Sequence, residues 1–149
     1  MSLSQNIGEE MKAAMKAKDK VRLEALRSIK SAILLANTEK GGGAELSDAD
    51  ELKILQRLQK QRKDSLEIYE QQGREDLAGE ERAQLEVIEG FLPKQMDEAE
   101  LKAYLQELIV RLDVKGPQDM GKIMGVASKE LAGKADGKTI SAKTKELLG

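Results

Sequence analysis

The sequence contains no histidine, cysteine or tryptophan, and these three absences exclude several kinds of chemistry. Without cysteine and histidine, the chain cannot build a Ser-His-Asp or Cys-His nucleophile pair, a thiol redox centre or a Cys/His zinc site. Binding of a hard cation by carboxylates alone stays open, because such ions need only oxygen ligands. From the residues we expect no catalytic residue, no bound metal and no cofactor.

Aromatic residues and long apolar runs are also scarce. The aromatic side chains are Tyr69, Phe91 and Tyr104, so recognition of single-stranded RNA by base stacking has almost no material. If RNA binds, its shape and phosphates must be recognised. No stretch approaches the roughly 20 apolar residues of a membrane span, and the first ten residues lack the pattern of a signal peptide. With no cysteine for disulfides, we expect a cytoplasmic protein that does not enter membranes.

What is present favours long helices. The 149 residues are 40% hydrophobic and 35% charged, with two prolines and a mean hydropathy of −0.52, which is typical of an all-α protein. Charge is uneven: residues 1–40 carry eight basic and five acidic side chains, residues 45–113 carry ten and eighteen, and residues 114–149 carry seven and four. The basic ends could touch a polyanion, although charge on amphipathic helices is usually a solvated face.

Apolar periodicity predicts four helices in the first 92 residues, at about 3–18, 20–40, 48–72 and 77–92. Asp19 and Ser47 are expected N-caps, and Gly41-Gly42-Gly43 is expected to be a flexible turn. The third helix would be roughly 36 Å long. We expect it to run antiparallel to the second helix as the spine of a bundle of long helices.

Pro93 marks the expected domain boundary, since proline disfavours helical geometry in the residue before it. We assign 1–92 to an N-terminal long-helix domain and 93–149 to a C-terminal three-helix bundle. In the latter, Asp97 with Glu100 forms a capping box, and helices are predicted at about 98–112, 120–131 and 140–148. Asp136 or Thr139 is expected to cap the last of these helices.

Glycine and lysine recur together in the last thirty residues. Gly121 and Gly125 lie four residues apart inside an amphipathic pattern, although glycine costs roughly 1 kcal/mol per helical residue relative to alanine. This spacing indicates close helix packing or close approach of a ligand to the backbone, and the nearby lysines favour an anion. Phosphates could meet the lysines and the backbone N–H groups of residues 133–139 at a helix N-terminus. The candidate nucleic-acid-binding set is Gly121, Lys122, Gly125, Gly133, Lys134, Gly137, Lys138, Lys143 and Lys145. The alternative is that these are solubilising lysines around a glycine turn.

A P-loop interpretation of residues 116–122 is unfavourable. Seven positions fit the motif, but Ile123 stands where a hydroxyl must reach magnesium. The preceding leucine spacing favours a helix over the required strand.

A second cationic set lies in the long-helix half of the chain. Its members are Arg22, Arg27, Lys60, Arg62 and Arg74. Arg62 falls in register with apolar positions, so it requires a carboxylate, and internal ion pairing competes with a ligand or partner site.

Several segments together resemble the YqeY-like family over nearly the whole chain. They are Lys60-Gln61-Arg62, Gly73-Arg74-Glu75-Asp76-Leu77, Leu92-Pro93, Met120-Gly121-Lys122-Ile123-Met124 and Gly133-Lys134-Ala135-Asp136-Gly137-Lys138. The resemblance implies a bundle of long helices followed by a three-helix part similar to the tail domain of GatB. GatB is the subunit of glutamyl- and aspartyl-tRNA amidotransferase that holds the tRNA and carries the kinase-transamidase site, and its tail is associated with tRNA recognition.

The resemblance therefore implies a tRNA-associated module, and nothing in the sequence looks like the catalytic cradle of GatB. Our leading hypothesis is a non-catalytic protein whose C-terminal half contacts the tRNA backbone. One alternative is an adaptor whose acidic long-helix half docks a translation or amidotransferase protein, or a second copy of the chain. An exposed apolar strip along residues 48–72 would favour this alternative. Another is the amidotransferase-like activity implied by the family label, a carbon-nitrogen ligase with glutamine as amido donor, which needs a pocket where Arg22, Arg62 and Arg74 converge with carboxylates.

Overall fold

All regular structure in the described part of the chain is helical. The computed structural model describes residues 2–41 and 46–149, and over these ranges it contains seven α-helices, one short 3-10 turn and no strand. The predicted all-α class is confirmed. The chain divides into two compact units, Met1–Leu92 and Pro93–Gly149, called here the N-terminal and C-terminal units.

The N-terminal unit begins with a hairpin of α1 (Leu3–Ala17) and α2 (Lys20–Glu39). Ser2 caps α1 in a capping box with Gln5. Lys18 adopts the left-handed conformation that ends α1, and Asp19 then caps α2 by accepting a hydrogen bond from the Arg22 backbone N–H at 3.1 Å. A very short connection therefore folds α2 back onto α1. Of the triple glycine, Gly41 has a φ of +89°, and the other two glycines lie outside the described residues.

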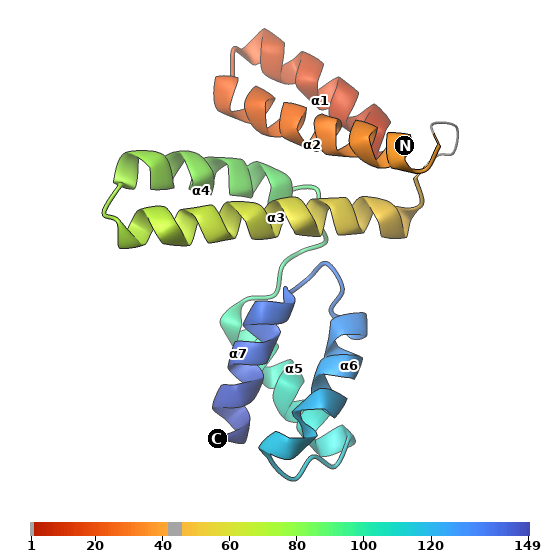
Figure 1. Ribbon diagram of the computed structural model, residues 1–149, viewed down its shortest axis with the longest axis vertical. Helices are drawn as coiled ribbons and strands as arrows, with labels where there is room; N and C mark the ends of the chain where they lie inside the picture. Colours follow the sequence, from red (N-terminus) through yellow and green to blue (C-terminus); the bar gives the residue numbers. More distant parts are fainter. Residues whose placement is uncertain (1, 42–45) are drawn as a thin grey trace. The chain divides into compact units, whose positions relative to one another are not determined.

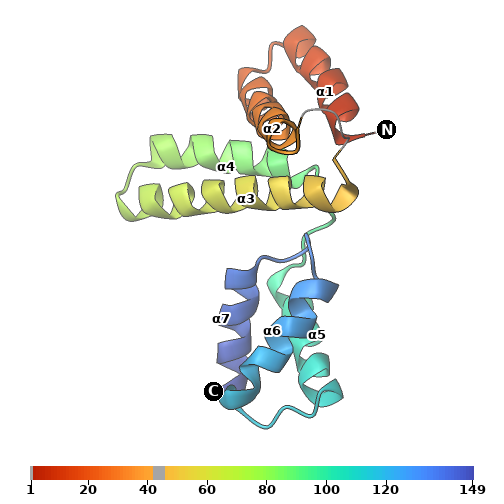
Figure 2. The ribbon, with the colours of Figure 1, turned by 45° about the vertical axis from the view of Figure 1, so that its right-hand side comes forward.

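The second hairpin consists of α3 (Asp48–Gln71) and α4 (Glu75–Glu89), joined at Gly73, whose φ is +70°. We expected α3 to run along α2 as the spine of the bundle, but α3 packs mainly against α4, while α2 packs mainly against α1 and α4. The tight turn at residues 72–74 explains this, since it returns the chain directly along α3. The two hairpins cross each other (Figures 1 and 2).

A single apolar core joins these four helices. It is built from residues of α1, α2, α3 and the end of α4, among them the fully buried Leu26, Ile29 and Ile88. Burying each such side chain contributes about 1.5–3 kcal/mol. The last helix of this unit ends at Glu89, before the predicted position, and Leu92 enters the core from the segment that follows.

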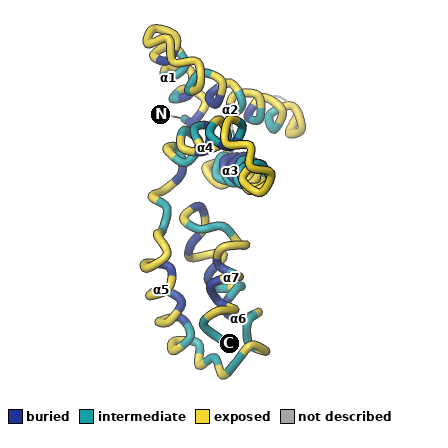
Figure 3. Tube along the Cα trace, turned by 90° about the vertical axis from the view of Figure 1, so that its left-hand side faces the viewer, coloured by how far each residue is buried: buried dark blue, intermediate teal, exposed yellow. Residues whose placement is uncertain are grey.

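The C-terminal unit contains α5 (Glu98–Arg111), a 3-10 turn at Pro117–Asp119, α6 (Met120–Glu130) and α7 (Gly137–Leu148). The Asp97–Glu100 capping box starts α5, as predicted. Buried positions recur along one side of each helix (Figure 3). The core residues that these helices and their ends share are Leu101, Leu105, Leu108, Ile123, Ala127, Leu131 and Ile140.

An exposed apolar strip along residues 48–72, which would have favoured an adaptor, is not found. In that range Ile68 is the large hydrophobic side chain that is exposed, at 51%. The leucines of α3 instead contribute to the core or are partly covered. Exposed Leu34 and Leu35, each at 56%, lie on α2.

Candidate nucleic-acid interface

The glycine-lysine segment forms α6, α7 and the loop between them. Gly133 is buried, and its φ of +79° lets the chain turn after α6. The Lys134 N–H donates to the Leu131 carbonyl at 2.8 Å, and the Lys134 carbonyl accepts from the Met96 N–H at 3.0 Å. The Gln95 side chain also donates to the Gly133 carbonyl. The loop is therefore fixed to the segment before α5, and the Lys134 side chain extends outward from a defined backbone.

Gly121 and Gly125 lie on the exposed face of α6. A Cβ atom built at either glycine would meet nothing within 4 Å, and the same holds for Gly137 at the start of α7. The close helix packing that their spacing indicated is therefore wrong. The alternative, an open backbone that a large ligand can approach, fits the structure.

The N-terminus of α7 already has a carboxylate. The Asp136 side chain accepts a hydrogen bond from the Thr139 N–H at 2.7 Å and caps the helix. A phosphate at this helix end would meet that negative charge, since the cap occupies the position where the helix dipole favours an anion. The lysine side chains are consequently better placed than these backbone N–H groups to contact phosphates.

Lys143 differs from the other candidate lysines. Its side chain is only 9% exposed, and its ammonium group lies 2.7 Å from a Glu98 carboxylate oxygen and 3.1 Å from one of Glu146. Hydrogen bonds to Glu98 first, and then to Glu146, raise the pKa of Lys143. This lysine links the last helix to the start of α5, so its charge is used within the unit.

The remaining candidate lysines, Lys122, Lys134, Lys138 and Lys145, are exposed. Lys122 lies 3.7 Å from the Asp119 carboxylate and is 64% exposed. Sequence reasoning missed Lys129, which is exposed and lies two helical turns after Lys122. The spacing of seven residues from Lys122 is the sequence signal that could have identified Lys129. Among the described residues, Lys129, Lys134 and Lys145 form no hydrogen bond or ion pair through their side chains.

The carboxylates of α6 and α7 are all engaged. Besides Asp136 and Glu146, the segment contains Glu130, whose carboxylate binds Arg111 at 2.5 Å and accepts the Tyr104 hydroxyl. Those bonds, to Arg111 first, lower the pKa of Glu130, while burial and the Glu130 contact raise the pKa of Tyr104 to about 12. Lys129, Lys134 and Lys145 are thus left as the available charges of this surface.

The second cationic set does not converge on one place. Arg22 binds Glu10 at 2.7 Å, Arg62 binds Glu81 at 3.1 Å, and Arg74 binds Asp76 at 3.1 Å. Arg27 and Lys60 are exposed and have no side-chain partner within the described ranges. A cavity of about 350 Å³ is lined by Arg22 together with Glu10 and Glu86, but Arg62 and Arg74 are not part of it. The convergent pocket that an enzyme would need is not formed by these three arginines.

A comparison with models of known protein families identifies the family of this chain. The model of the family described as Yqey-like protein matches residues 4–148. The chain belongs to the YqeY-like family.

Similar proteins are known under the name altered inheritance of mitochondria protein 41, mitochondrial. The protein from Pyrenophora tritici-repentis (strain Pt-1C-BFP) is 28% identical over 144 residues, which cover 94% of this chain and 77% of the relative. The one from Lachancea thermotolerans is 32% identical over 117 residues, covering 75% of this chain and 60% of the relative. The one from Clavispora lusitaniae is 35% identical over 111 residues, covering 72% and 63%.

Other kinds of site find little support in this YqeY-like chain. Residues 116–122 form an extended glycine, the 3-10 turn and the start of α6, and they follow a helix, so the strand of a P-loop is missing. Across residues 2–41 and 46–149, no group of three or more carboxylates is placed to hold a metal ion. Over the same residues, no helix combines the length and apolar character that a membrane crossing requires.

Proposed function

We propose that this YqeY-like protein binds the backbone of tRNA through its C-terminal unit, without catalysing a reaction itself. The observation that carries the proposal is the charge balance of α6 and α7. Lys129, Lys134 and Lys145 are exposed and unpaired among the described residues, whereas each carboxylate of the same segment is engaged. Exposed, uncompensated lysines attract phosphates and release counterions when they bind them.

The aromatic residues support recognition of the backbone over recognition of bases. Tyr104 is the aromatic side chain of the C-terminal unit, and its hydroxyl is bound to Glu130. Stacking platforms for unpaired bases are therefore scarce, and a folded RNA would be recognised by its shape and phosphates. The open backbone at Gly121 and Gly125 leaves room for such a bulky ligand.

tRNA is proposed over other polyanions because of the resemblance of this unit to the GatB tail domain. The cytoplasm stays the expected location of this protein, and the relatives are named as mitochondrial proteins. An amidotransferase-like activity has less support, because the arginines that would form its pocket lie in separate ion pairs.

The adaptor alternative keeps one specific observation in its favour. Leu34 and Leu35 on α2 are each 56% exposed, and Arg27 and Lys30 on the same helix are exposed cations. Such a mixed surface could bind a translation or amidotransferase protein. This surface lies on α2, whereas residues 48–72 show no exposed apolar strip of the kind that would have favoured an adaptor.

The test is binding of purified protein to total tRNA over a series of salt concentrations. Replacing Lys129, Lys134 and Lys145 by glutamate should weaken binding strongly and lower the slope of log affinity against log salt by roughly two to three. A matched control carries the same charge change at exposed Lys12, Lys20 and Lys30 of the N-terminal unit. Equal losses in both variants would indicate only a net-charge effect, and an unchanged affinity in the first variant would refute the proposal.

A further inference from the structure

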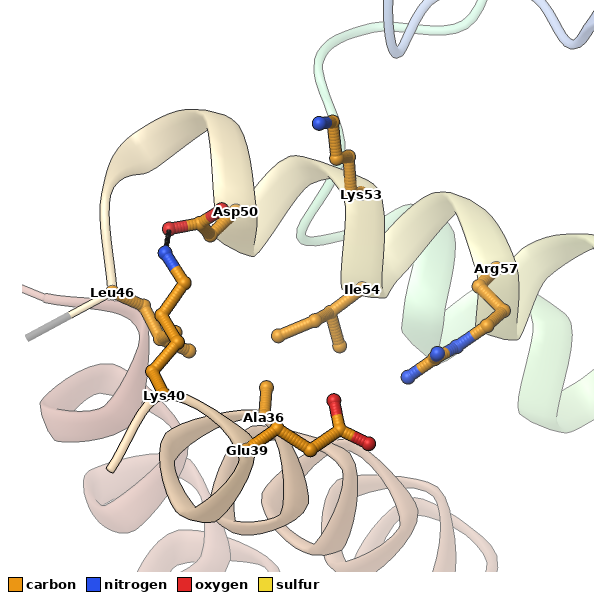
Figure 4. Close-up of a pocket in the computed structure, with 8 residues that line it drawn as sticks. All are labelled: Ala36, Glu39, Lys40, Leu46, Asp50, Lys53, Ile54 and Arg57. Carbon is orange, nitrogen blue, oxygen red and sulfur yellow. Dashed lines mark hydrogen bonds and ion pairs between the residues drawn. The ribbon is translucent and has the colours of Figure 1, made fainter. Parts of the chain in front are cut away.

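A cavity of about 310 Å³ lies in the N-terminal unit between the end of α2 and the first half of α3 (Figure 4). Its apolar part is formed by Ala36, Leu46 and Ile54. At one end Lys40 and Asp50 form an ion pair, and Asp50 also accepts the Ser47 N–H at 3.2 Å. The charged groups of Lys40 and Asp50 therefore already have partners within the protein.

The other end of the cavity carries two opposite charges that do not bind each other. Glu39 extends from α2 and Arg57 from α3, and Figure 4 shows their charged groups pointing toward each other, to one side of Ala36 and Ile54. Neither side chain forms a hydrogen bond or ion pair with another described residue. Lys53 also lines the cavity, but its ammonium group points away from this space.

We propose that this cavity binds a free α-amino acid with an apolar side chain. A single small molecule that carries a cation and an anion close together, as an amino acid does, can bind both side chains at once. Its ammonium group would donate to Glu39, and its carboxylate would accept from the guanidinium of Arg57. The side chain would cover Ala36, Leu46 and Ile54, and the volume is at the lower end of the range for small-molecule sites.

Direct pairing of Glu39 with Arg57 does not block this site. Both residues are exposed, and an exposed ion pair contributes little to stability, so a ligand can replace it at small cost. The cavity is open to solvent on this side, so affinity should be weak, with a dissociation constant on the order of 1 mM. The proposal concerns the N-terminal unit and does not depend on tRNA binding.

The experiment is a titration of the full-length, ¹⁵N-labelled protein with leucine, followed by amide chemical shifts. Saturable shifts should be confined to residues near 36–40 and 50–57. N-acetyl-leucine lacks the ammonium charge and leucinamide lacks the carboxylate, so each should bind at least tenfold more weakly than leucine.

Two single substitutions test which charged group of leucine each side chain binds. Glu39→Gln should abolish the preference for leucine over N-acetyl-leucine, and Arg57→Gln should abolish the preference over leucinamide. Lys60→Gln is the matched control, because Lys60 is exposed on α3 and does not line the cavity. All three residues are exposed, so the fold should be kept, and the amide spectrum checks this directly.

The absence of saturable shifts, or equal binding of leucine and both analogues, would overturn the proposal. Tight binding of N-acetyl-leucine with no need for the free ammonium would also overturn it, since the site would then suit the C-terminus of a peptide. The tRNA affinity of Arg57→Gln should equal that of the unchanged protein, which separates this site from the proposed function.

Discussion

In the N-terminal unit, carboxylates bind four of the six arginines. In α6 and α7, by contrast, one lysine, Lys143, is buried, and the other lysines extend from the surface. The difference follows from the side chains. The planar guanidinium of arginine can bind both oxygens of a carboxylate, as Arg62 does with Glu81. A lysine ammonium is a compact, strongly hydrated charge that stays in water unless a partner is placed beside it. A count of cations therefore says little about which of them a ligand can reach.

The cores of the two units also differ. The N-terminal core is built from four helices that include the 24-residue α3, whereas the C-terminal core holds three helices of 11 to 14 residues with seven buried side chains. A smaller core buries a smaller fraction of the chain, so the C-terminal unit should be the less stable one. Both differences between the two units, in stability and in the charges that a ligand can reach, can be tested.

The largest expected effect is the loss of a core side chain. Leu105 is fully buried in the C-terminal unit, and Leu105→Ala should destabilise that unit by about 3 kcal/mol through lost apolar contact and the cavity left behind. Leu26→Ala is the matched change in the N-terminal core. Urea unfolding followed by amide signals from each unit should show each substitution lowering the midpoint of its own unit. A common shift of both midpoints would show that the units unfold together.

The next effect separates buried from exposed lysines. Lys145→Glu should weaken tRNA binding roughly fivefold at about 0.1 M salt and leave thermal stability nearly unchanged, because the side chain is exposed and unpaired among the described residues. Lys143→Gln should lower the thermal stability of the C-terminal unit and leave the salt slope unchanged, since its charge serves Glu98 and Glu146. A change in salt slope for Lys143→Gln would contradict the assignment of this residue.

A smaller effect is expected from the open glycine of α6. Gly125→Ala should stabilise the C-terminal unit by about 0.5–1 kcal/mol, because alanine favours the helix and its Cβ would meet nothing within 4 Å. Gly90→Ala should bring no such gain, since its Cβ would lie 3.2 Å from the Val87 carbonyl oxygen. Thermal denaturation measures both changes. A loss of tRNA affinity in Gly125→Ala would show that RNA approaches the α6 backbone itself.

The smallest effect concerns acid stability of the N-terminal unit. Hydrogen bonds from Lys40 first, and then from Ser47, lower the pKa of Asp50 from 3.8 to about 2. Because its pKa is lower in the folded chain, Asp50 stabilises the fold above pH 3.8, and this contribution is lost as the pH falls through about 2. Asp50→Asn should therefore flatten the acid side of the stability profile, measured by urea unfolding between these two pH values. An identical profile in both proteins would exclude this ion pair as a source of acid sensitivity.

Much of the fold followed from local sequence signals. Caps at Asp19, Ser47 and Asp97 placed helix starts correctly, because a side-chain oxygen that accepts a backbone N–H acts within one helical turn. The partner of α3 could not be predicted in the same way. It depends on how the turn at Gly73 returns the chain, and the apolar stripe of α3 is compatible with either neighbour.

The candidate interface was predicted less well in its details. Lys143 and Lys145 look equivalent in the sequence, and only the position of Glu98, 45 residues earlier, shows that Lys143 is occupied. The role of Gly121 and Gly125 was also ambiguous, since glycine spacing alone does not show whether a helix neighbour is present. Both questions concern contacts across the fold, which local periodicity does not encode.

The contacts that close the C-terminal unit also bear on the order in which the chain folds during synthesis. Met96 and Glu98, near its beginning, are held by Lys134 and Lys143, near its end. The hairpin of α1 and α2 forms between segments that are close in the sequence, and contacts between such segments form fastest. We therefore expect the first hairpin to fold while the ribosome is still translating, and α5 to stay without its ion pair until α7 has emerged.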